Sequence, residues 1–142
     1  DVQWWLEWYT ATGTTAVTAT VNVTYNDGTT GALTGASLAA TRPASFMLSL
    51  NALIPAASSG KYIRAVNNVT LSATTGTAGS FGVTATRPRM TLAAPIANMK
   101  FVADWAQLGF PEIFNESCLF PIVLTSTTST GTVRGGGKIS HG

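Results

Sequence analysis

The chain has 142 residues, of which 45% are hydrophobic and only 10% are charged, and its formal net charge at pH 7 is +2. Typical soluble domains carry roughly 25% charged residues, so we expect neighbouring protein chains to cover part of this surface. The small net charge excludes a basic groove for nucleic acid, and no apolar run approaches the ~20 residues of a membrane-spanning helix. The length suits a single domain, which we expect to cover residues 1–142.

The clearest strand covers residues 16–25. Alternate residues from Val17 to Tyr25 are apolar, and Thr or Asn stands between them, which is the two-residue period of a sheet with one buried face. Asp27-Gly28 then has the composition of a tight hairpin turn. We therefore expect a returning strand over residues 30–33.

Further strands follow by the same reasoning. Residues 46–51 alternate before the loop "PAASSG", and residues 81–85 alternate near the middle of the chain. The segments "CLFPIVL" and "TVRGGGKIS" flank a last Thr/Ser/Gly connection. In residues 62–71 we expect one face to hold Ile63, Ala65, Asn67, Val69 and Leu71, and the other Tyr62, Arg64 and Val66.

One segment, "ANMKFVADWAQLGFP", departs from this pattern. Phe101, Trp105 and Leu108 fall at helical spacing, with Gly109 and Pro111 where a helix would end. We predict one short helix of two or three turns near residues 98–108. The fold class is then all-β: an antiparallel β-sandwich or jelly roll with that single helix.

A similar stretch occurs twice, over residues 22–43 and 68–88, and each copy ends in Ala-Thr-Arg-Pro. We interpret each copy as two strands joined by a turn, after which the chain leaves the sheet at Thr-Arg-Pro in the same way. Arg42 and Arg87 would then lie at equivalent positions on the rim of the fold. The alternative is chance similarity in a chain with few residue types.

The residues that catalysis needs are scarce. His141 is the only histidine and lies beside the Gly-rich end, and Asp104, Glu112 and Glu116 read as surface residues in and around the helix. In "RGGGKIS" the Lys is followed by Ile, whereas a phosphate-binding loop requires Ser or Thr there. We predict a protein that is not an enzyme and has no cofactor and no metal site.

Cys118 is the only cysteine, so an internal disulfide is excluded, and its apolar neighbours indicate a buried side chain. This favours synthesis in a reducing compartment, although a secreted protein without disulfides would look the same. Glycosylation patterns begin at Asn22, Asn68 and Asn115, and they matter only in an exported protein of a glycosylating organism.

The first ten residues, "DVQWWLEWYT", concentrate aromatic side chains of the kind that anchor interfaces or stack on sugars. Alternation puts Trp4, Leu6 and Trp8 on one face, and Trp5, Glu7 and Tyr9 on the other. One face suits the domain's own core, and the second suits a core, a subunit contact or a carbohydrate platform. The candidate interface residues are Trp4, Trp5, Trp8, Tyr9, Arg42 and Arg87.

The segments "NVTLSATTGTAGSFGVTATRP" and "DWAQLGFPEIFNESCLF", followed by a Gly-rich end, give the chain a resemblance to virion structural proteins of tailed bacteriophages. It resembles most the jelly-roll cement or decoration proteins of capsids. The resemblance implies a homo-oligomer, a dimer or trimer, that binds the major capsid protein on the capsid surface. Assembly would take place in the host bacterial cytoplasm, without membrane or nucleic acid as partner.

Two other classes remain open. A secreted filament or pilus subunit would complete a neighbour's sheet by β-strand addition. A carbohydrate-binding module would expose its tryptophans to sugar rings.

Overall fold

The computed structural model describes residues 2–38, 40–76, 79–93, 99–109 and 112–124. The chain divides into two compact units, Asp1–Phe110 and Pro111–Gly142. All strands of the described residues belong to the first unit. The expectation of a single domain over residues 1–142 stays a prediction.

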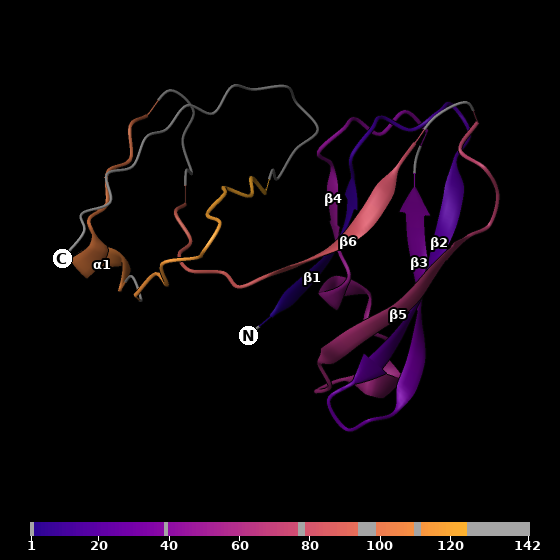
Figure 1. Cartoon of the computed structure of the whole chain (residues 1–142), viewed down its shortest axis with the longest axis horizontal. Coiled ribbons are helices and arrows are strands. Elements are labelled where there is room, and N and C mark those ends of the chain that lie inside the picture. The colour runs from indigo at the N-terminus through magenta and orange to yellow at the C-terminus, as the bar shows by residue number, and fades with distance from the viewer. Residues whose placement is uncertain (1, 39, 77–78, 94–98, 110–111, 125–142) are drawn as a thin grey trace. The chain divides into compact units, whose positions relative to one another are not determined.

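Six strands form two antiparallel three-stranded sheets, with the strand orders β4-β1-β6 and β3-β2-β5 (Figure 1). The predicted all-β antiparallel sandwich is thereby confirmed. Two 3-10 turns, η1 (Asn51–Leu53) and η2 (Ala56–Ser58), connect β4 to β5. The strands are β1 (Gln3–Trp8), β2 (Val17–Tyr25), β3 (Thr30–Leu38), β4 (Met47–Ser49), β5 (Ile63–Leu71) and β6 (Phe81–Thr86).

The core lies between the two sheets. Both contribute to one cluster of buried apolar side chains, with Leu6 and Trp8 from β1 and the alternate apolar residues of β2. The centroid of the Trp8 ring lies 5.8 Å from the centroid of the Phe46 ring and 6.3 Å from that of the Phe81 ring. The predicted inward residues of β2 are all buried: Val17, Ala19, Val21, Val23 and Tyr25.

The first hairpin forms where the sequence predicts it. Gly28 adopts a φ of +82°, and Thr29 donates its backbone N–H to Asp27 Oδ1 over 3.0 Å. The returning strand β3 extends beyond the predicted residue 33 to Leu38. A β-bulge at Gly35, which has a φ of +85°, shifts its register against β2. The bulge also interrupts the two-residue alternation, which is why the second half of this strand gives no simple sequence signal.

The predicted faces of β5 are wrong in the middle of the strand, whereas Val69 and Leu71 pack against the core as predicted. Two register shifts against β2 leave Arg64 and Asn67 without a paired residue. As a result Val66 packs against the core, whereas Asn67 is exposed. A bulge adds one residue to one strand, and it therefore exchanges the faces of the residues that follow.

The repeated stretch does not form two equivalent hairpins. Its first copy is the β2–β3 hairpin, but in its second copy β5 pairs with β2 and β6 pairs with β1. The chain thus crosses from one sheet to the other between β5 and β6 (Figure 1). The prediction is wrong because the turn "ATTGTAG" is long enough to span the sandwich rather than close a tight hairpin.

The helix is shorter than predicted. Only α1 (Trp105–Leu108) is helical, residues 99–104 are not, and residues 94–98 lie outside the described part. Asp104 and Gln107 form a capping box, in which Gln107 N donates to Asp104 Oδ1 over 2.8 Å and Asp104 N to Gln107 Oε1 over 3.3 Å. Gly109 ends the turn with a φ of +56°, as expected.

The strand predicted for "CLFPIVL" is also wrong, since residues 118–124 have no regular secondary structure. Pro121 stands at its centre and cannot donate to a sheet ladder. The strand predicted over "TVRGGGKIS" lies outside the described residues.

Candidate functional site

Strand β1 is the central strand of its sheet, and its two faces have different surroundings. Leu6 and Trp8 enter the core, and Trp4 packs against its edge, as the alternation predicts. Trp4 is held at three atoms. Its backbone N donates to Asn51 Oδ1 over 2.8 Å, its carbonyl accepts from Leu50 N over 2.9 Å, and its indole Nε1 donates to the carbonyl of Ile63 over 3.0 Å. The last bond joins the two sheets.

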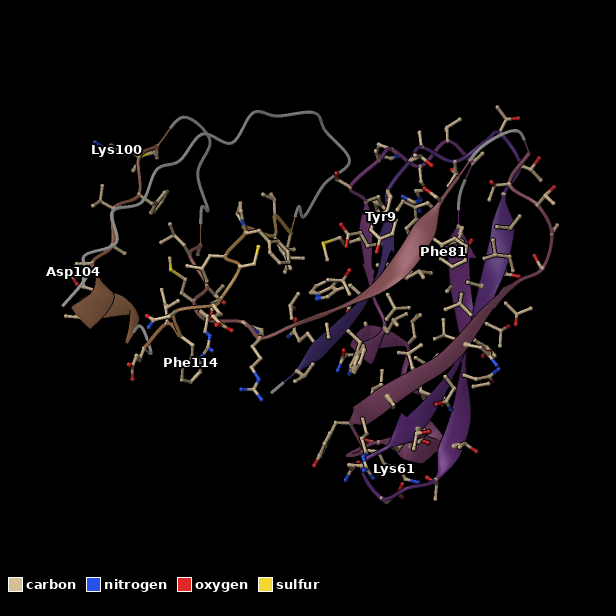
Figure 2. The ribbon with its side chains drawn as sticks, viewed as in Figure 1. Tyr9, Lys61, Phe81, Lys100, Asp104 and Phe114 are labelled. Carbon is tan, nitrogen blue, oxygen red and sulfur yellow. The ribbon has the colours of Figure 1, made fainter. Side chains whose placement is uncertain are left out.

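The opposite face of β1 holds Trp5, Glu7 and Tyr9. Trp5 Nε1 donates to Thr86 Oγ1 over 2.8 Å, and the carboxylate of Glu7 accepts from the hydroxyl of Thr84. Both side chains are therefore hydrogen-bonded to residues of β6. Trp5 is only 5% exposed, although it does not belong to the core cluster. Tyr9 is 54% exposed and lies beside β6 (Figure 2).

These positions revise the predicted interface. Trp8 is 1% exposed within its own chain, so its side chain belongs to the core, and a role for it at an interface stays a prediction. Trp5 is buried too, whereas Trp4 is half-buried. Tyr9 is therefore the aromatic residue of this set that presents most of its ring to solvent. An interface through Tyr9 stays a prediction.

Arg42 and Arg87 are not equivalent. Arg42 is half-buried with its guanidinium 4.3 Å from the ring centre of Phe46, and its backbone N donates to Thr12 Oγ1 over 2.8 Å. Thr41 and Ser45, with φ values of +57° and +63°, hold the loop around it in a strained conformation. Arg87 follows β6 and is exposed. The expected symmetry fails because their strands belong to different sheets.

A groove of about 760 Å³ opens at one end of the sandwich. Trp4 and Gln3 line it from β1, and Tyr62 and Arg64 line it from the start of β5. Tyr62 is 62% exposed and Arg64 is exposed. Sequence reasoning missed this groove, because its walls come from segments about sixty residues apart.

The exposed apolar residues form a second feature that sequence reasoning missed. Apart from Tyr9 and Tyr62, every exposed large hydrophobic side chain of the described residues follows β6. The residues are Met90, Leu92, Met99, Val102, Phe114, Leu119, Phe120, Val123 and Leu124.

Cys118 lies in the same segment and is exposed, which corrects the expectation of burial. Its apolar neighbours Leu119 and Phe120 are exposed with it, so local hydrophobicity was a misleading guide. Asp104 caps the helical turn (Figure 2), and Glu112 and Glu116 are exposed. His141 and the sequence "RGGGKIS" lie outside the described residues.

Within the described ranges, no group of three His, Cys, Asp or Glu side chains is placed to hold a metal ion. No helix in the same ranges has the length and hydrophobicity to span a membrane. Comparisons with protein-family models, curated proteins and solved structures found no match. The functional reading therefore depends on the residues of this chain and on their geometry.

Proposed function

We propose that this protein is a non-enzymatic virion structural protein of a tailed bacteriophage. It acts as a capsid cement or decoration protein, which binds the major capsid protein as a dimer or trimer and stabilises the shell. The observation that carries the proposal is the contrast between a well-packed sandwich and the exposed apolar side chains that follow it.

The exposed segment favours a large protein partner. Soluble monomers rarely expose apolar patches beyond a few hundred Å², because each Å² removed from water contributes about 25 cal/mol. Leu119, Phe120, Val123 and Leu124 lie within six residues of one another and are all exposed. Their burial against a second chain would release this free energy, so we expect the segment to act as the binding arm.

The low charge of the chain suits the same role. Only 10% of its residues are charged, so few ions lose their hydration when its surface is covered. Binding driven by apolar burial also survives high salt, whereas binding through surface ion pairs is screened. The exposed thiol of Cys118 is compatible with assembly in a reducing cytoplasm.

The resemblance noted in residues 68–88 and 104–120 supports the capsid as the location. That resemblance covers the end of the sandwich and much of the exposed segment. The proposed arm thus falls in the part of the chain where the likeness to cement proteins is found.

A filament subunit is the second candidate, and one observation favours it. Strand β3 is an edge strand of nine residues, and it contains no charged residue and no proline. Such an edge lacks the features that usually prevent pairing with another chain. In this reading a neighbouring subunit would add a strand beside β3.

Co-sedimentation tests the proposal. The chain is mixed with shells assembled from the major capsid protein encoded beside its gene, and pelleted protein and shell melting temperature are measured. We expect the chain to pellet with the shells and to raise their melting temperature. A triple variant, Leu119→Ser, Phe120→Ser and Val123→Ser, should lose binding, while the control Tyr62→Ser on the sandwich should retain it.

The outcomes separate the candidates. A chain that stays in the supernatant at every shell concentration contradicts the capsid proposal. If the chain instead forms fibres alone, and a charge placed on β3 by Ala32→Lys abolishes them while the triple variant does not, the filament proposal replaces it. Light scattering of the chain alone measures the expected dimer or trimer.

A further inference from the structure

The groove beside Trp4 joins one aromatic residue from each sheet with hydrogen-bonding side chains. Trp4 comes from β1, and Tyr62 precedes β5 directly. Gln3 and Asn51 line the groove with amide groups, and Arg64 is the one charged residue among the lining residues that the structure describes. None of these described lining residues is acidic.

The aromatic residues are held firmly in place. The indole of Trp4 is fixed by its bond to the carbonyl of Ile63. Tyr62 is tied on both sides, since its backbone N donates to Asn26 Oδ1 and its carbonyl accepts from Asn26 N, each over 3.0 Å. Ligand binding would therefore require little ordering of the Trp4 indole and of the Tyr62 backbone, which lowers its entropic cost.

Arg64 owes its position to the bulge in β5. The register passes from Tyr25–Ile63 to Thr24–Ala65 and leaves Arg64 without a partner across the sheet. Bulges of this kind redirect a side chain and are common beside binding sites. The guanidinium is exposed at the groove and carries a planar set of donors suited to a carboxylate.

The backbone around the groove is already bonded, which disfavours an extended peptide as the ligand. Trp4 N, Tyr62 N and the carbonyls of Tyr62 and Ile63 all have partners within the chain. A peptide that binds by strand addition needs free backbone groups. Recognition must instead use side chains, namely aromatic faces, amides and one guanidinium.

We propose that this groove binds an acidic saccharide, a glycan that contains uronic acid or a similar carboxylated sugar. The apolar face of a sugar ring packs on Tyr62 and Trp4, and Gln3 hydrogen-bonds its hydroxyl groups. Arg64 pairs with its carboxylate. The site and the capsid proposal rest on different residues, since the described lining residues of the groove come from residues 2–4, 51, 62–64 and 88.

Isothermal titration calorimetry of the full chain tests the site, with tetragalacturonate as the acidic probe and cellotetraose as the neutral one. We expect tetragalacturonate to bind at concentrations below about 10 mM and more tightly than cellotetraose, with a preference that shrinks at high salt. Tyr62→Ala and Arg64→Gln should each weaken tetragalacturonate binding about tenfold. Arg64→Gln should leave cellotetraose binding unchanged.

Two matched controls lie outside the groove. Tyr9→Ala removes a tyrosine of similar exposure, and Arg87→Gln removes another exposed arginine, and neither should change binding. A thermal melt confirms that each variant is folded. The proposal is overturned if neither saccharide binds, if Tyr9→Ala weakens binding as much as Tyr62→Ala, or if Arg64→Gln leaves tetragalacturonate binding intact.

Discussion

The ring of Tyr25 lies across Gly31 on the neighbouring strand and leaves no space for a side chain there. A Cβ at Gly31 would stand 2.7 Å from Cε2 and 3.1 Å from Oη of the ring. The second sheet repeats this relationship, because Tyr9 covers Gly82 in the same manner. In each sheet the glycine pairs with a residue of the neighbouring strand, and the tyrosine lies two residues after that partner in the sequence.

The two glycines should respond differently to the same substitution. Tyr25 is 2% exposed and has no room to move, so Gly31→Ala should lower the free energy of unfolding by about 1–3 kcal/mol through overpacking. Tyr9 is largely exposed, and its ring can swing into solvent, so Gly82→Ala should change stability by less than about 0.5 kcal/mol. Urea unfolding of both variants measures the difference. Equal losses would show that Tyr9 is as confined as Tyr25.

Substitutions of Trp8, the last residue of β1, and of Tyr9, the next residue, should have different effects on folding and on assembly. Trp8 is in the core, so Trp8→Ala should cost about 3–5 kcal/mol of stability. Tyr9→Ser should leave stability within about 1 kcal/mol, but weaken self-association if Tyr9 forms the subunit contact. Light scattering beside a thermal melt measures both properties. An unchanged mass for Tyr9→Ser would remove Tyr9 from the interface.

The Asp27–Lys61 pair should give stability a defined pH dependence. The bond from Lys61 Nζ over 2.8 Å, together with those from Thr29, lowers the pKa of the Asp27 carboxyl far below its ordinary value of 3.8. A lowered folded-state pKa adds stability above the ordinary value, and this stability is lost as the pH falls below 3.8 toward the lowered pKa.

The variant Asp27→Asn lacks this contribution at every pH. The melting-temperature difference between the natural chain and the variant should therefore be constant at neutral and mildly acidic pH, and should shrink below pH 3.8. Because the pair is at the surface, high salt should also reduce the difference. A difference that grows in acid would contradict the assignment.

The outer face of the β3-β2-β5 sheet carries a side-chain pair that a double-mutant cycle can measure. Asn22 Nδ2 donates to Asn68 Oδ1 over 2.7 Å between β2 and β5. The cycle through Asn22→Ala and Asn68→Ala should give a coupling energy of about 0.2–1 kcal/mol. The Thr20–Thr70 pair, two register positions away, has no bond between its side chains in the described set and serves as the control. Equal couplings in both pairs would assign the effect to strand pairing alone.

The thiol of Cys118 should react in the folded protein. Because it is exposed, Ellman's reagent should modify one thiol per chain without denaturant, at a rate similar to that in urea. Cys118→Ser supplies the blank. A reaction that begins only in urea would show that the thiol is covered.

The sequence allowed the fold class and the clearest strand to be predicted, because β2 has one dry face and obeys a strict two-residue period. It did not allow the faces of β3 and β5 to be predicted, since bulges at Gly35 and Asn67 shift the register without an evident residue signature. The crossing between β5 and β6 was missed for a related reason. Pairing with β1 depends on residues far away in the chain, whereas the repeat suggested a local hairpin.

For the candidate sites, too, some features could be predicted from the sequence and others could not. The inward face of β1 followed from alternation alone, and Leu6 and Trp8 are buried as expected. Trp4 and Arg64 line the groove together although they come from different sheets. No local sequence pattern predicts that two such distant residues lie close in space. Exposure of the segment around Phe120 was equally hidden, because composition reports hydrophobicity but not whether a core is available for it.

The central position of β1 has a consequence for synthesis on the ribosome. Its neighbours β4 and β6 begin at Met47 and Phe81, so β1 is synthesised well before either of the strands with which it pairs. At about 5–20 residues per second the tryptophan-rich strand is exposed for several seconds or longer. Long-range pairing of this kind also slows folding. The nascent chain is therefore vulnerable to aggregation at residues 3–8, and a chaperone that shields them should raise the yield of native protein.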